Sequence, residues 1–104
     1  MSVGWKAFEL RIAKALGGRR AGPMGAAVSD IVGVPWSVEC KRSIRGVPEG
    51  RWLEKARVQG KREGKPWLLV VGRHNDRAPI VVMTFAEFLR LAIKAGEIEG
   101  AVAD

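Results

Sequence analysis

The sequence predicts a single α/β domain in which helices flank a mixed central β-sheet. The chain of 104 residues has room for one compact domain, 1–104, and little more. Segments with helical periodicity alternate with short strand-like segments, in the order helix, three strands, helix, two strands, helix. One strand-like segment, 67–73, is almost entirely apolar, as expected of a strand that is covered on both faces.

The first half of the chain supplies one helix and three strands. Residues 4–16 predict a helix because large apolar side chains recur on one arc at about 100° per residue. These side chains are Trp5, Phe8, Ile12 and Leu16, and Gly17-Gly18 follows as a stop. A weak strand is expected at 19–20 within a mobile loop over 19–27. Two further strands are expected at 28–34 and 36–42, with a tight connection between them.

The second half of the chain supplies two helices and two strands. A loop at 43–50 leads to a second helix over 51–63, which Gly64 and Pro66 end. Residues 74–77 predict a turn between the strand at 67–73 and another at 79–83. The capping box Thr84-x-x-Glu87 then opens a last helix that runs to about Ala95.

Charge points to the class of partner. Eighteen Lys and Arg against eleven Asp and Glu give a formal net charge of +7, which favours a polyanion such as DNA. The excess is concentrated in residues 41–65, which hold nine basic and three acidic side chains, whereas residues 85–104 hold two and four. A generally solvated basic surface is the alternative interpretation.

Composition also excludes several classes of protein. No apolar run approaches the roughly 18 residues of a membrane span, and residues 1–5 lack the features of a secretory signal. We therefore expect a cytoplasmic protein with no membrane partner and no small-molecule cofactor. One cysteine, Cys40, and one histidine, His74, exclude a disulfide framework and a Cys/His zinc site. Cys40 is expected to be a small buried thiol, and His74 a bystander in a turn.

Three acidic residues and a lysine lie where a charge is costly unless something binds it. Glu9 falls inside the apolar arc of its helix, and Asp30 lies in the first of two tightly connected strands. Glu39 and Lys41 share one face of the second strand. The tight connection between the two strands would bring Asp30 close to Glu39 across the pair. Two converging carboxylates suit Mg²⁺ or Mn²⁺, and an adjacent lysine can stabilise charge that develops on a phosphate.

These residues resemble the PD-(D/E)XK nuclease signature, in which Asp30 is followed by Glu39-Cys40-Lys41. Glu9 resembles the extra acid that many of these nucleases carry on the preceding helix. The wider pattern is similar to the archaeal-type Holliday junction resolvases, including small phage-encoded ones. It consists of Gly4-x-x-x-Phe8-Glu9, Gly17-Gly18-Arg19-Arg20, Ser29-Asp30-Ile31-Val32 and Val38-Glu39-Cys40-Lys41-Arg42. The resemblance covers roughly residues 4–73 and departs from the signature at Ser29, where proline is usual.

The resemblance implies a restriction-endonuclease-like core and a metal-dependent endonuclease that cuts four-way DNA junctions by paired nicks. Paired nicks imply a symmetric homodimer. Glu9, Asp30, Glu39 and the Cys40 carbonyl are the implied metal ligands. Lys41 is implied as a catalytic residue, and a glutamine matching Gln59 often approaches the metal-bound water or the lysine. Phosphate contacts are expected from eight basic residues, which are Arg19, Arg20, Arg42, Arg45, Lys55, Lys61, Arg62 and Lys65.

Each of the candidate residues also has a purely structural interpretation. Glu39 and Lys41 would form an ion pair on a solvated strand face, and Asp30 would be a turn acid at a strand start. Glu9 would be a partnered helix acid, and Gln59 a satisfied interior amide. For the whole chain, the alternatives are a PD-(D/E)XK nuclease that acts on other DNA structures and a catalytically silent basic DNA-binding module.

Overall fold

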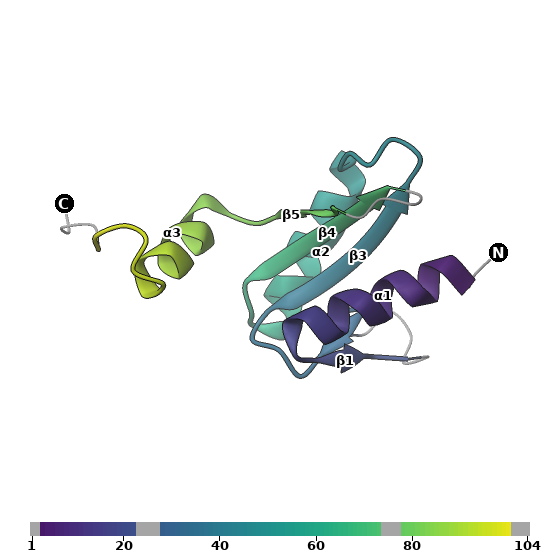
Figure 1. Ribbon diagram of the computed structural model, residues 1–104, viewed down its shortest axis with the longest axis horizontal. Coiled ribbons are helices and arrows are strands. Elements are labelled where there is room, and N and C mark those ends of the chain that lie inside the picture. The colour runs from purple at the N-terminus through teal and green to yellow at the C-terminus, as the bar shows by residue number, and fades with distance from the viewer. Residues whose placement is uncertain (1–2, 23–27, 74–77, 101–104) are drawn as a thin grey trace.

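An α/β fold with a five-stranded mixed sheet is seen in the computed structural model, which describes residues 3–22, 28–73 and 78–100 (Figure 1). The predicted element order is confirmed for these residues. The elements are α1 (Val3–Leu16), β1 (Arg19–Arg20), β2 (Ile31–Val32), β3 (Ser37–Ser43), α2 (Gly50–Glu63), β4 (Trp67–Arg73), β5 (Ile80–Val82) and α3 (Phe85–Lys94). The turn predicted at 74–77 and part of the predicted mobile loop, 23–27, lie outside the described residues.

The strands lie side by side in the order β1-β2-β3-β4-β5. β3 and β4 are parallel, with Glu39 opposite Leu69 and Lys41 opposite Val71, while the other three strand pairs are antiparallel. A parallel pair needs a long crossover, and α2 supplies it between β3 and β4. β3 and β4 are the two longest strands, and β3 is the central strand of the sheet. The candidate residues Glu39 and Lys41 lie on β3.

Two apolar clusters cover the two faces of the sheet. On the α1 face, buried Phe8 and Ile12 pack with Val38 and Cys40 of β3. The other face carries Leu69 and Val71 of β4 and Ala56 of α2, with Trp52, Leu53, Trp67 and Val82 at the margin. Because successive side chains of a strand point to opposite faces, Glu39 and Lys41 lie on the α2 face.

Two strands are shorter than predicted, and one side chain is more exposed than predicted. β2 is much shorter than the predicted 28–34, so Asp30 directly precedes β2 instead of lying within it. The backbone of Asp30 is still paired, because its N–H donates to the Val38 carbonyl and its carbonyl accepts from the Ala21 N–H, both at 2.9 Å. β5 covers only Ile80–Val82. Trp5 was expected in the apolar stripe but is 45% exposed, since it lies in the first turns of α1, before burial begins at Phe8.

α3 extends beyond the end of the sheet, away from α1 and α2 (Figure 1). The predicted capping residue is confirmed, because Thr84 Oγ1 accepts from the Glu87 N–H at 3.1 Å. Gly96 follows the helix with a φ of +80°, a value that favours glycine and suits a helix stop. None of the helices in the described residues is long and apolar enough to cross a membrane.

Candidate functional site

The Asp30 side chain is fixed against the middle of β3 by one hydrogen bond. Its Oδ2 accepts from the Cys40 N–H at 2.8 Å. Cys40 stands between Glu39 and Lys41 in the chain, so this bond places the Asp30 carboxylate beside both residues. The predicted approach of Asp30 to Glu39 thus arises from a side-chain bond to the backbone of β3.

Glu39 is a buried carboxylate, with only 4% of the residue exposed. Burial, and after it the nearby charge of Asp30, raise its pKa from 4.5 to about 7. Lys55 and Lys41 oppose this shift without reversing it. Glu39 therefore does not lie on a solvated strand face, and no ion pair among the described residues joins it to Lys41.

Glu9 is the second buried carboxylate, 3% exposed on α1. Burial raises its pKa, the hydrogen bond from Arg20 lowers it, and the charge of Asp30 raises it again. Its Oε1 accepts from Arg20 Nε at 2.9 Å. Its Oε2 is buried and has no hydrogen-bond partner among the described residues, which is uncommon for a buried polar atom.

These carboxylates fit a small hard cation only in part. Asp30 is electrostatically coupled to both Glu9 and Glu39. Across the described parts of the chain, however, no three His, Cys, Asp or Glu side chains group closely enough to hold a metal ion. Mg²⁺ needs only one or two carboxylates, because water and substrate phosphate complete its coordination. Asp30 and Glu39 meet that requirement, whereas Arg20 engages Glu9, and the Cys40 carbonyl stays a prediction.

The Cys40 side chain lies in the apolar core and not on the Glu39 face of β3. It is 2% exposed and packs in the apolar cluster beneath α1. Burial raises the pKa of the thiol well above its usual range, and the charge of Asp30 adds to this shift. The expectation of a small buried thiol is therefore confirmed.

Gln59 belongs to a polar cluster that also contains a residue overlooked in the sequence. Its Nε2 donates to Glu63 Oε2 at 2.9 Å, and its Oε1 accepts from Arg62 at 3.1 Å. Glu63 in turn accepts from the Ser29 N–H at 2.8 Å and from Ser29 Oγ at 3.1 Å. Burial favours a higher pKa for Glu63, but the bonds from Gln59 and Ser29 outweigh it and lower the pKa.

This cluster anchors the segment that carries Asp30. Ser29 directly precedes Asp30 and is 2% exposed, so its bonds to Glu63 tie the strand start to the last turn of α2. Ser29 stands where the nuclease signature has proline, and a proline could not donate the N–H bond. The spacing Gln59-x-x-x-Glu63, which puts two polar groups on one helix face, is the signal that could have identified Glu63.

The eight predicted phosphate contacts do not share one face. Arg42 is half-buried on the α1 face, with its guanidinium 5.9 Å from the Phe8 ring centroid. Arg20 is held by Glu9 and lies 6.0 Å from the Trp5 ring centroid. The cations of α2 lie on the opposite side of the sheet, because α2 packs Ala56 against Leu69 and Val71 on that face. The exposed members are Arg19, Arg45, Lys55, Lys61, Arg62 and Lys65.

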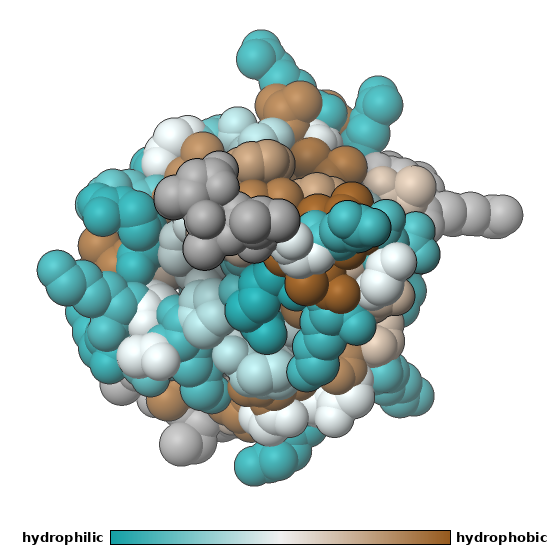
Figure 2. Space-filling model, turned by 90° about the vertical axis from the view of Figure 1, so that its left-hand side faces the viewer, coloured by the Kyte–Doolittle hydropathy of each residue, from teal (hydrophilic) through white to brown (hydrophobic). Residues whose placement is uncertain are grey.

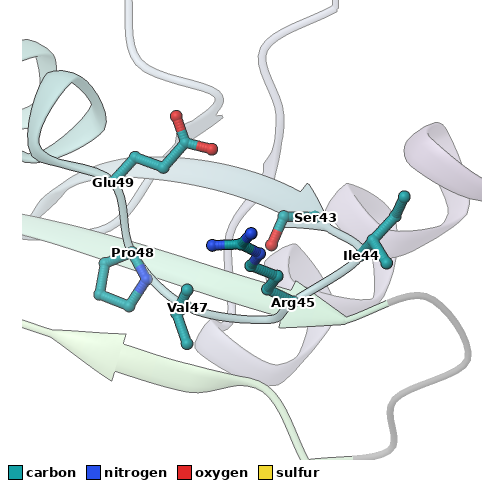
Figure 3. Close-up of a pocket in the computed structure, with 6 residues that line it drawn as sticks. All are labelled: Ser43, Ile44, Arg45, Val47, Pro48 and Glu49. Carbon is teal, nitrogen blue, oxygen red and sulfur yellow. The ribbon is translucent and has the colours of Figure 1, made fainter.

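A pocket of about 410 Å³ opens in the loop between β3 and α2, just past Lys41 (Figure 3). Its lining combines apolar and charged residues, and the Arg45 side chain reaches across the inside of the loop (Figure 3). The lining residues are Ser43, Ile44, Arg45, Val47, Pro48 and Glu49. The loop turns tightly because the Gly46 N–H donates to Ser43 Oγ at 2.8 Å.

The described residues define an α/β protein with a five-stranded mixed sheet and three helices. Comparisons with protein-family models, with curated proteins and with solved structures find no match to this chain.

Proposed function

We propose that this protein is a metal-dependent endodeoxyribonuclease that resolves four-way DNA junctions by paired cleavage. One observation carries the proposal. The Asp30 carboxylate is fixed by the Cys40 N–H beside Glu39, a buried carboxylate whose pKa is raised to about 7. A buried acid that is costly to ionise, next to a second carboxylate and a lysine, is typical of a site that binds a cation.

Asp30 and Glu39 would hold a Mg²⁺ or Mn²⁺ ion, with the Cys40 carbonyl as a further ligand. The ion would supply positive charge to the scissile phosphate and to the water that attacks it. Lys41 lies on the same strand face as Glu39 and is half-buried, so its ammonium can stabilise charge that develops on the phosphate. Ser29, Gln59 and Glu63 position this group by tying the Asp30 segment to α2.

The exposed basic residues would bind DNA through its phosphates, with an affinity that depends on salt and little on sequence. Such contacts suit an enzyme that recognises the shape of a junction. Paired cleavage of a two-fold symmetric junction requires two active sites, so the proposal includes a homodimer.

A catalytically silent DNA-binding module is the second candidate. The ion pair between Arg20 and Glu9 favours it, because a cation already neutralises one of the three implied acids. The two candidates share the basic surface and differ in whether any divalent metal supports cleavage.

The test is a cleavage assay on a synthetic four-way junction and on a linear duplex of the same length, with Mg²⁺, with Mn²⁺ and with EDTA. The variant Asp30→Asn keeps a side-chain acceptor for the Cys40 N–H but removes the charge. We expect it to lose cleavage by at least about a hundredfold while junction affinity changes little, because ligands and phosphate contacts are different residues. Glu54→Gln, which removes an exposed carboxylate on α2, is the matched control.

Three outcomes separate the alternatives. Metal-dependent cleavage of the junction in preference to the duplex, lost in Asp30→Asn and kept in Glu54→Gln, supports the proposal. Equal cleavage of both substrates replaces it with a nuclease of broader substrate range. Tight DNA binding by the wild-type protein with no cleavage in either metal would establish the silent module.

A further inference from the structure

α3 presents an apolar face that the described part of its own chain leaves uncovered. Phe85 is 73% exposed and Phe88 52% exposed, and their rings stack with centroids 6.3 Å apart. Ile93 and Ile98 continue the face at 36% and 42%. Figure 2, which views the molecule from the α3 end, shows hydrophobic residues gathered on this side with hydrophilic residues around them.

The position of α3 is fixed by polar contacts at its start. Trp36 Nε1 donates to Glu87 Oε2 at 2.8 Å, and Glu87 is 7% exposed although it belongs to a surface helix. Arg90 binds the same carboxylate at 2.6 Å. The Trp36 bond joins α3 to a distant part of the described chain, whereas the Arg90 contact and the Thr84 cap are local to the helix itself.

Polar contacts alone do not account for the stability of α3. The helix has 10 residues, and isolated helices shorter than about 12–15 residues are marginal in water. Most helical stability in proteins comes from packing an apolar face. The described body of the chain packs Met83, just before α3, into a core cluster, and it leaves Phe85 and Phe88 exposed. A stable α3 therefore implies a partner on that face.

The uncovered face continues onto an open edge of the sheet. β5 is the last strand in the strand order, and two residues separate it from α3. Its Ile80 and Val81 are 44% and 48% exposed. An apolar edge strand presents unpaired backbone groups that favour pairing with a strand from another chain. A second copy of β5 can supply that strand by antiparallel pairing across a two-fold axis.

The charge of the segment that contains β5 and α3 favours a second copy of this chain as the partner. Residues 78–100 carry two basic and three acidic side chains, whereas the whole chain carries +7. This segment is therefore where two copies of the chain meet with the least repulsion. The same balance disfavours DNA, and a helix that binds an anionic membrane carries a Lys- and Arg-rich polar face that α3 lacks.

We propose that the apolar face of α3, together with the free edge of β5, is the surface through which two copies of this chain associate. Phe85 and Phe88 of each copy pack against α3 of the other. A phenylalanine side chain presents about 200 Å², so these two rings alone expose roughly 250 Å² in each copy. Ile80, Val81, Ile93 and Ile98 extend the surface toward the roughly 800 Å² per partner of a stable interface.

This surface supplies the homodimer that paired cleavage needs, and in that respect the inference rests on the proposed function. The experiment is sedimentation equilibrium of the full chain over a range of concentrations, without DNA. We expect a wild-type dimer and a mostly monomeric Phe85→Glu/Phe88→Glu variant, with the dissociation constant raised by roughly 100-fold or more. Circular dichroism shows whether the variant keeps its fold, and both rings are exposed enough for the core to tolerate the change.

A control and a second variant keep the test decisive. Ile44→Glu changes an apolar residue that is 87% exposed on the β3–α2 loop, far from α3 in Figure 1, and should leave the dimer intact. Val81→Lys places a charge on the β5 edge and should weaken association without touching α3.

A wild-type monomer, or a dimer that survives both the α3 and the β5 variants, overturns the inference. Binding of a wild-type monomer to vesicles of anionic lipid would assign the face to membranes instead. These results are independent of cleavage. A dimer that dissociates in the α3 variant but never cleaves DNA supports this surface and refutes the nuclease. A protein that cleaves DNA and stays dimeric in both variants supports the nuclease and refutes this surface.

Discussion

Replacing Glu39 by glutamine should stabilise the metal-free protein at alkaline pH. Glutamine has the same size as the protonated acid but cannot ionise. In the native protein the pKa of Glu39 is raised from 4.5 to about 7, mainly by burial and then by Asp30. The native state thus holds the Glu39 proton more tightly than the unfolded chain does. Its stabilising effect is complete below pH 4.5 and is lost as pH rises through 7.

The magnitude follows from the pKa shift. Each unit corresponds to about 1.4 kcal/mol, so a shift from 4.5 to about 7 gives an upper bound of about 3 kcal/mol. We expect the stability of Glu39→Gln relative to wild type to rise by up to that amount between pH 4.5 and pH 8. The assay is urea denaturation with EDTA present, followed by tryptophan fluorescence at several pH values.

Glu54→Gln is the control, because Glu54 is exposed and pairs only with Arg57 among the described residues. Its stability relative to wild type should change little with pH. A Glu39→Gln difference that stays constant from pH 4.5 to pH 8 would refute the reasoning, since it would mean that Glu39 ionises as easily in the native protein as in the unfolded chain.

Two further predictions concern packing and the placement of α3. A Cβ added at Gly72 would lie 2.6 Å from the Phe8 ring, so Gly72→Ala should destabilise by about 1–3 kcal/mol in urea denaturation. Gly50→Ala, with no atom within 4 Å of the added Cβ, should be nearly neutral, and equal effects of the two would contradict the packing. Trp36→Phe removes the donor to buried Glu87 and should cost about 1–3 kcal/mol. An unchanged unfolding midpoint for Trp36→Phe would show that the bond does not hold α3.

The elements with strong local signals could be predicted from the sequence. The apolar run of β4 matches its residues Trp67–Arg73, and Thr84 caps α3 as its spacing indicates. Both signals depend on residues adjacent in the chain, so local chemistry determines them. β2 was overestimated because strand-forming valine and isoleucine residues lie on both sides of Ser29-Asp30, where bonds to Glu63 and from Cys40 replace part of the strand pairing. Such bonds join residues distant in the sequence, which local patterns do not report.

In the candidate site, too, local patterns predicted some features, while others depend on contacts between residues distant in the sequence. The period of β3 correctly put Glu39 and Lys41 on one face, and the apolar arc of α1 correctly indicated that Glu9 is buried. The link between Arg20 and Glu9 could not be predicted, because it depends on how β1 passes α1. The role of Glu63 was missed because an acid near the end of a basic helix resembles an ordinary surface residue. Only the fold brings it against Ser29.

The burial of Cys40 gives this protein a built-in reporter of its own opening motions. The thiol lies at the middle of β3, and its raised pKa keeps it protonated, so a thiol-reactive reagent cannot modify it while the sheet is closed. Modification requires a transient separation of α1 from the sheet or global unfolding. Since Cys40 is the single cysteine of the chain, its labelling rate measures how often the strand that carries the candidate site becomes accessible to solvent.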